Sequence, residues 1–173
     1  PVMNFIDRAL VSAYLHSKEE TSFRLLYSRH TKSLWNMAMK LTNGDMHQAE
    51  EIVQDTWMRA IQSLDKFEWR SSLRTWLIRI CINRWKENRR KVSTIGLEDV
   101  ANNATTYSVS SYDTFKIVAL LPEGYQTVLL LHDLEGYKHE EIAQLLDIAP
   151  GTSKSQLHQA RKAFRNLIQK ENI

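Results

Sequence analysis

The sequence predicts an all-α fold, built as two small helical domains that a flexible linker joins. Apolar residues recur every three or four positions along most of the 173 residues, which is the spacing of one face of a helix. Glycine (5) and proline (3) are rare, whereas architectures built of strands and turns need many turn residues. One polar stretch in the middle of the chain lacks the helical spacing, and it divides the chain in two.

The first domain is predicted to span residues 3–91 and to contain four helices. A short helix comes first, and capping signals at 17–20, 45–48 and 71–72 mark the starts of three longer helices, each with an apolar stripe. Serine, threonine and asparagine then crowd residues 92–114, and a structureless stretch of this length is rarely internal to a compact domain. We therefore interpret residues 92–114 as an interdomain linker.

The second domain is predicted to span residues 115–173. Pro122 suits the first turn of its leading helix, and a short helix at 139–146 follows. A tight connector at 147–151 then leads to a last helix that Thr152 can cap. Two helices joined by a short turn, of which the second is basic, are typical of a helix-turn-helix.

The net charge of +3 hides a strong segregation of charge along the chain. Residues 45–57 contain four acids and no base, whereas residues 70–91 contain eight bases and one acid. The pattern repeats, because residues 123–147 contain six acids and one base, and residues 152–170 contain five bases and no acid. Two basic blocks, each after an acidic one, indicate a polyanion that binds at two places.

Both basic blocks have features of nucleic-acid binding. The polar side of the last helix suits the major groove, where Lys and Arg meet guanine and phosphate and Gln can pair with adenine. The candidate DNA-binding residues of this helix are Thr152, Lys154, Ser155, His158, Gln159, Arg161 and Lys162. In the other block aromatic side chains, which can stack unpaired bases, alternate with the basic ones. Phe67 and Trp69 are the freer candidates, because Trp76 and Trp85 also lie on the apolar stripe and fit a core role.

No group of residues predicts catalysis, a metal site or a cofactor. The six histidines are scattered, and His139 lacks the second histidine four residues later that a zinc-protease helix needs. No glycine-rich phosphate loop exists, and the single cysteine, Cys81, lies on an apolar stripe. We expect no small-molecule substrate. The single cysteine and the lack of an apolar run of roughly 18 residues favour a cytoplasmic protein.

Several short segments carry a resemblance to a known family. They are Ala49-Glu50-Glu51-Ile52-Val53-Gln54-Asp55-Thr56-Trp57, Trp76-Leu77 with Asn83, Glu87 and Arg90, Pro122-Glu123, Glu141-Ile142-Ala143, and Gly151-Thr152-Ser153-Lys154-Ser155. In this order and spacing they resemble the extracytoplasmic-function (ECF) sigma factors of bacterial RNA polymerase, within the sigma-70 superfamily. The resemblance covers nearly the whole chain.

The resemblance implies that residues 3–91 are sigma region 2, for the −10 element, and that residues 115–173 are region 4, for the −35 element. From its charge alone, the acidic helical face at 48–57 could simply be exposed to solvent. The resemblance implies instead that this face docks on the polymerase, because Glu51, Gln54 and Asp55 match positions that grip the β′ clamp helices. The residues expected to bind the −10 element are Phe67, Trp69, Arg70, Asn83, Arg84, Lys86 and Arg90. The implied partners are core RNA polymerase, promoter DNA and an anti-sigma factor.

The chain departs from the family pattern in its last helix. Ser153 stands where the family usually has a buried valine, and Gln156 and Gln159 stand where arginine is common. These departures bear on how the −35 element is read. The alternative to a sigma factor is a stand-alone helix-turn-helix regulator, which binds duplex DNA without the polymerase.

Overall fold

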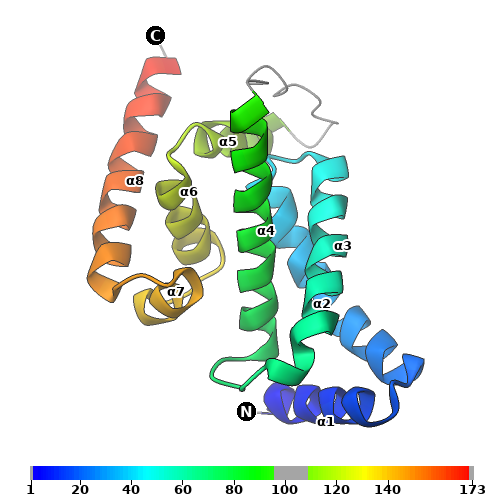
Figure 1. Ribbon diagram of the computed structural model, residues 1–173. Helices are drawn as coiled ribbons and strands as arrows, with labels where there is room; N and C mark the ends of the chain where they lie inside the picture. The colour runs from blue at the N-terminus through cyan, green and yellow to red at the C-terminus, as the bar shows by residue number, and fades with distance from the viewer. Residues whose placement is uncertain (1, 96–108, 172–173) are drawn as a thin grey trace.

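The structure, a computed structural model, describes residues 2–95 and 109–171 (Figure 1). The helices of the first half are α1 (Val2–Ser17), α2 (Glu20–Leu41), α3 (Met46–Ser63) and α4 (Leu73–Ile95), with a 3-10 turn, η1 (Leu64–Lys66), after α3. Those of the second half are α5 (Val109–Ala119), α6 (Glu123–Leu129), α7 (His139–Leu146) and α8 (Pro150–Glu171), with a π-helical turn, η2 (Leu130–Leu134), after α6. The described ranges contain no strand, which confirms the all-α prediction.

The first half is a bundle of α2, α3 and α4, with α1 lying across one end of it (Figure 1). The apolar stripes of the three long helices meet in a core that includes Leu34, Ile52 and Leu77, each at most 1% exposed. Full burial of such a side chain stabilises the fold by about 1.5–3 kcal/mol. The indole N–H of Trp57 donates to Thr31 at 3.0 Å, so this large ring is buried without losing its hydrogen bond.

Side-chain caps start two of these helices at the predicted places. Asp45 accepts a hydrogen bond from the backbone N–H of Gln48 at 3.0 Å, and Ser72 accepts one from Thr75 at 3.1 Å. Each cap satisfies a backbone donor that has no partner within the helix. The capping box predicted at 17–20 is wrong, because the N-cap residue of α2 makes no side-chain capping bond.

From Pro122 onward the second half follows the predicted order, but it begins with a helix that was not predicted, α5, and Pro122 is the N-cap of α6 rather than part of its first turn. The start of the last helix is also shifted. The connector before α8 is shorter than expected, because the helix begins at Pro150, whose fixed φ suits a first turn. Thr152 therefore lies inside the first turn and does not cap the helix. The sharp change of direction before α8 occurs at Asp147, which takes the left-handed conformation at φ 56°.

The predicted linker, residues 92–114, is helical at both ends. α4 continues to Ile95, and α5 begins at Val109. The rest of this stretch, residues 96–108, lies outside the described residues.

The two halves pack against each other along α4. Figure 1 shows α6 and α7 beside α4, with α8 on their far side. The buried hydrophobic residues of both halves form one continuous cluster. Polar contacts among the described residues also cross the boundary: Lys40–Glu135, Arg74–Glu135, Lys86–Glu123 and Arg89–Gln126.

Candidate nucleic-acid interface

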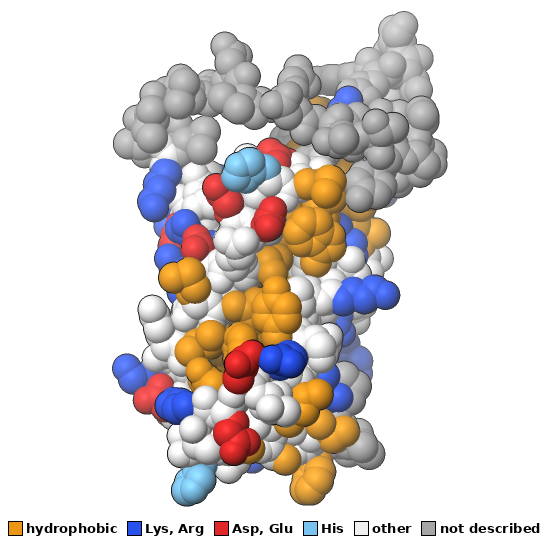
Figure 2. Space-filling view, turned by 90° about the vertical axis from the view of Figure 1, so that its right-hand side faces the viewer, with side chains coloured by type: hydrophobic (Ala, Val, Ile, Leu, Met, Phe, Trp, Pro, Cys, Tyr) orange, Lys and Arg blue, Asp and Glu red, His pale blue; other side chains and the backbone are white. Residues whose placement is uncertain are grey.

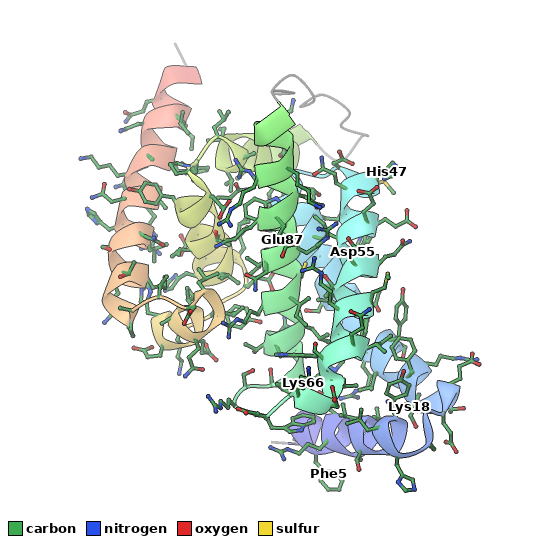
Figure 3. All side chains as sticks on the ribbon, viewed as in Figure 1. Phe5, Lys18, His47, Asp55, Lys66 and Glu87 are labelled. Atoms are coloured by element: carbon green, nitrogen blue, oxygen red, sulfur yellow. The ribbon has the colours of Figure 1, made fainter. Side chains whose placement is uncertain are left out.

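The acidic face of α3 divides between solvent and α4. The side chain of Glu51 is 58% exposed, and Gln54 is also exposed and donates a hydrogen bond to Glu50, one turn earlier in its own helix. Asp55 instead accepts a hydrogen bond from the Arg84 guanidinium on α4 at 2.5 Å (Figure 3). Two of the three predicted docking residues thus face outward, and the third is paired within the bundle.

Glu87 and Arg59 extend this pairing into a network between α3 and α4. Glu87 accepts hydrogen bonds from Arg59 at 2.7 and 2.9 Å and from Arg84 at 3.3 Å. The hydrogen bond from Arg59 is the main cause that lowers the pKa of the Glu87 carboxyl. The side chain of Arg84 is 16% exposed, so this predicted DNA-binding residue lies between two carboxylates. Arg59 was not predicted from the sequence, because its partner lies 28 residues away.

Exposed hydrophobic side chains lie beside the acidic face. Met58 and Ile61 of α3 are 58% and 36% exposed, and Tyr27 of α2 is 42% exposed. Figure 2, which views the side of the molecule where α3 lies, shows hydrophobic side chains gathered down this face between charged ones. Apolar groups bordered by charges are typical of a protein-binding surface. Met58 was not predicted from the sequence, although it follows Gln54 by one helical turn.

The loop between η1 and α4 holds a column of aromatic rings. Phe67 lies between Trp69 and Trp76, with ring centroids 4.7 and 4.8 Å away. Trp69 has a left-handed backbone at φ 58°, which is uncommon for a bulky residue. Beyond Trp69 the guanidinium of Arg8, from α1, lies 4.6 Å from its ring centroid. Arg70, the next predicted residue, is exposed and pairs with its neighbour Glu68 at 2.7 Å.

The predicted strand-binding residues of α4 differ in their surroundings. Asn83 is exposed, and Trp85 is 2% exposed, which confirms the core role favoured for that ring. Lys86 lies 3.6 Å from the Glu123 carboxylate on α6, so the second half covers this residue. Arg90 is exposed near the end of the helix.

A cavity of about 310 Å³ separates the loop at 67–72, called the aromatic loop below, from α7. Its lining comes from both halves of the chain: Arg70, Ser71, Thr75, Trp76, Arg79, Gln144 and Leu145. Hydroxyl, guanidinium and indole groups therefore surround a space beside the loop, and α7 forms its opposite wall.

The predicted DNA-facing residues of α8 are all exposed, on the side opposite Leu157 and Ala160, which pack inward. They are Thr152, Lys154, Ser155, His158, Gln159, Arg161 and Lys162. Arg161 donates two hydrogen bonds to Asp133 of η2, at 2.6 and 3.0 Å. Arg161 is the main cause that lowers the pKa of the Asp133 carboxyl, so this arginine also ties α8 to its own half.

Ser153 joins α8 to α7. It is completely buried, and its hydroxyl lies 2.9 Å from Nδ1 of His139. The His139 ring stacks on His132 of η2 with a centroid separation of 4.7 Å. Burial first, and then the charges of His132 and Lys154, lower the pKa of His139. The serine that departs from the family pattern thus makes a hydrogen bond that a valine cannot make.

The described residues contain no group of three or more His, Cys, Asp or Glu side chains arranged to hold a metal ion. Cys81 lies in the core, where burial raises the pKa of its thiol to about 12. Within the described ranges, no helix is both long and apolar enough to cross a membrane.

Comparison with family profiles gives two matches. Residues 26–94 match "Sigma-70 region 2", and residues 116–164 match "Sigma-70, region 4". Together they take up more than half of the chain, in the order expected from the resemblance.

Similar proteins cover nearly the full length. The chain is 28% identical to the ECF RNA polymerase sigma-E factor of Haemophilus influenzae, over 94% of this chain and 95% of that protein. The solved sigma factor RpoE of Bartonella quintana, in complex with the anti-sigma factor NepR, is 25% identical, with a TM-score of 0.69 over 85% of this chain and 96% of that one. CnrH, in complex with the cytosolic domain of CnrY, shares the fold at 23% identity, with a TM-score of 0.69 over 95% of this chain and 98% of that chain.

Proposed function

The chain belongs to the sigma-70 family as an ECF-type RNA polymerase sigma factor, and we propose which of its surfaces carries each task of a sigma factor. It directs core RNA polymerase to specific promoters and assists melting at the −10 element. The polymerase makes the bonds, and this chain catalyses no reaction of its own. It works in the cytoplasm, together with the polymerase.

The face of α3 docks on the β′ clamp helices of the polymerase. Glu51 and Gln54 are exposed there, and Asp55 borders them through its pair with Arg84. The exposed Met58 supplies an apolar contact beside these polar groups. In Figure 1 α3 lies on the opposite side of α4 from α7 and α8, so docking does not compete with the second half.

Residues 3–91 bind the unpaired −10 strand, and within them the aromatic loop and α4 contact it. Phe67 and Trp69 supply aromatic faces, and Asn83 presents an exposed amide to base edges. Basic groups hold the strand's phosphates, which are negatively charged along the whole strand. These groups are Arg70, Lys86 and Arg90, whereas Arg84, which pairs with Asp55 and Glu87, joins α4 to α3.

Residues 115–173 bind the −35 element, and the exposed side of α8 reads its bases. The amino-terminal positions Lys154, Ser155, His158 and Gln159 face bases, and Thr152 bonds phosphate. Arg161 and Lys162 lie further along and contact phosphate or, as the bond to Asp133 supports for Arg161, hold the domain together.

Promoter binding requires the two halves to separate. Two elements about two duplex turns apart lie roughly 70 Å from each other, at 34–36 Å per turn. In the packed arrangement Lys86 is paired with Glu123, and α7 forms one wall of the cavity beside the aromatic loop. Residues 92–114 act as the linker that allows this separation.

An anti-sigma factor holds the free chain. One structural neighbour, the sigma factor RpoE of Bartonella quintana, was solved in complex with the anti-sigma factor NepR, which supports a similar partner here. We expect that partner to cover the docking face of α3 and the DNA-binding faces.

The observation that carries this function is the presence of both sigma-70 regions on one chain. In vitro transcription tests it, with core polymerase alone and with core polymerase plus this chain, on a set of genomic promoters. New transcripts that appear only with the chain are the expected result. Binding to duplex DNA without any polymerase-dependent transcription would indicate the stand-alone regulator instead.

A further inference from the structure

We propose that Arg8 of α1 belongs to the strand-binding site, and that its guanidinium covers the face of Trp69 on which an unpaired base stacks. On this proposal the incoming base displaces the guanidinium, and Arg8 then pairs with a phosphate of the bound strand. The inference rests on the proposed function, because it refines the −10 site of the same protein.

α1 is anchored so that Arg8 reaches the loop. Asp7, the preceding residue, is 3% exposed, accepts a hydrogen bond from Arg29 at 3.0 Å and lies 3.0 Å from Nε2 of His30. These bonds hold α1 on α2. Figure 3 shows α1, with Phe5 labelled, directly below the turn that carries Lys66, which leads into the aromatic loop.

The conformation of Trp69 marks this loop as a functional position. A bulky side chain at φ 58° is strained, and such backbone conformations persist only where the surroundings hold them. Here Phe67 contacts one side of the indole ring, and Arg8 covers it from another element. Strained residues of this kind cluster at ligand-binding sites.

An unpaired base can occupy the place on the Trp69 ring that the Arg8 guanidinium occupies in the structure. The guanidinium lies 4.6 Å from the Trp69 ring centroid, within the range of a cation–π contact. A guanidinium and a nucleobase are both planar and both stack on aromatic rings, so one can replace the other on the same face. The column Trp76–Phe67–Trp69 then gains a base at its end in place of Arg8.

Displacement leaves Arg8 ready to bind a phosphate. No carboxylate among the described residues pairs with Arg8, so its movement breaks no ion pair there. Arg70 follows Trp69 directly in the chain, and with Arg8 it places positive charge at this end of the ring column. Arg79 adds positive charge at the cavity beside Trp76. The nucleotide whose base stacks on Trp69 therefore has a cationic partner for its backbone.

The test uses holoenzyme, assembled from core polymerase and the full chain, and the non-template −10 strand of a promoter identified by the transcription assay above. Binding is measured on the intact strand and on versions with one abasic site at each position, over a range of salt concentrations. The variants are Trp69→Gly, which suits the positive φ, Arg8→Ala and Arg8→Lys. Arg24→Ala removes an equal charge from an exposed residue of α2 and serves as the control.

We expect one abasic position to weaken wild-type binding about 5- to 150-fold, the usual range for loss of one stacked base. Trp69→Gly removes that penalty at this position alone. Arg8→Ala lowers the magnitude of the slope of log K against log salt by about 0.7, the value for one single-strand phosphate, whereas Arg8→Lys and Arg24→Ala keep the wild-type slope.

A penalty that survives in Trp69→Gly, or an Arg8→Ala slope equal to the wild-type slope, overturns the proposal. A uniform loss of affinity in Arg8→Ala with an unchanged slope means that Arg8 only holds the loop, and this also overturns it. Failure of the wild-type chain to support transcription from any promoter overturns the proposed function itself, which is a separate and earlier result.

Discussion

Arg74 of α4 donates a hydrogen bond to the Glu135 carboxylate at 3.3 Å, and this contact ties the two halves of the chain together. Lys40 of α2 pairs with the same carboxylate, whose side chain is only 11% exposed. One acidic residue of the second half thus binds two basic residues of the first. This carboxylate is one of the polar groups that join the halves in the packed arrangement, in which Lys86 is covered.

We predict that Glu135→Ala shifts the chain toward separated halves, because it removes the carboxylate that Lys40 and Arg74 share across the boundary. Two dyes on cysteines introduced at the exposed positions Ser28 and Gln169 report the separation by energy transfer. Cys81 does not interfere, because its buried thiol has a pKa of about 12. We expect lower transfer in Glu135→Ala than in wild type, and wild-type transfer that falls as salt screens the pairs.

The control for this measurement is Glu140→Ala, which removes an exposed carboxylate of α7. It should keep wild-type transfer. Equal transfer in Glu135→Ala and Glu140→Ala would show that apolar packing alone holds the halves together.

Glu51→Lys combined with Gln54→Ala is predicted to abolish binding to core polymerase and to leave the fold intact. Both side chains are exposed, so the change should alter the free energy of unfolding by no more than about 0.5 kcal/mol. Pull-down of core enzyme measures the binding, and circular dichroism checks the fold. Glu19→Lys, an exposed change at the start of α2, is the control, and retained pull-down by the double variant would contradict the docking face.

Asn83→Ala is predicted to blur base preference on the −10 strand more than it weakens overall binding. Its amide is exposed on α4, and an amide can distinguish base edges, whereas basic groups attract every strand alike. Binding of residues 3–91, and of holoenzyme, to strands that differ at one base provides the measurement. Asn166→Ala on α8 is the matched control, and an unchanged ranking of strands in Asn83→Ala would remove this residue from the site.

Gln159→Ala is predicted to change the ranking of −35 variants, at a cost of about 1–3 kcal/mol at one base position. Arg165→Ala should weaken all variants alike and reduce the salt dependence, because an arginine further along the helix contacts phosphate. Binding to a panel of −35 mutant duplexes separates the two effects. Gln169→Ala is the control amide, and a ranking that Gln159→Ala leaves intact would exclude this face of α8.

The stability of the second half should fall as the pH drops below about 6.5. The folded chain lowers the pKa of His139 from its ordinary value of 6.5, so in the acidic window the unfolded chain binds this proton more readily. The contribution of His139 to stability is therefore complete above pH 6.5 and decreases as the pH falls toward the lowered pKa. Burial and the charges of His132, Lys154 and Arg161 oppose the charged form of His139, and Glu140 favours it.

Urea unfolding at pH 7.5 and pH 5.5 measures this effect on the free energy of unfolding. His139→Asn should reduce the difference between the two pH values, because asparagine does not titrate. His16→Asn, which replaces an exposed histidine of α1, should keep it. A pH dependence that is equal in both variants would assign the effect to other groups.

The amino-acid sequence by itself determined the helices and most of their ends. An apolar stripe at helical spacing can be recognised without knowing what it packs against. The caps Asp45 and Ser72 bind a backbone N–H three residues later, so they too are local signals. The prediction failed at 17–20 and at Thr152, where several residues near a helix start could serve as its cap. The exposed side of α8 was also readable, since it lies opposite an apolar stripe.

Tertiary structure alone decided which of these side chains meet. Arg84 binds Asp55, which lies 29 residues away in the sequence, and Arg74 binds Glu135, which lies 61 residues away. In the sequence each arginine is one of several in a basic block, and only the packing of the helices gives it its partner. The contact of Arg8 with Trp69 likewise exists only because α1 crosses the end of the bundle. Helical periodicity is a local property of the chain, whereas the pairing of charges follows the packing of distant apolar faces.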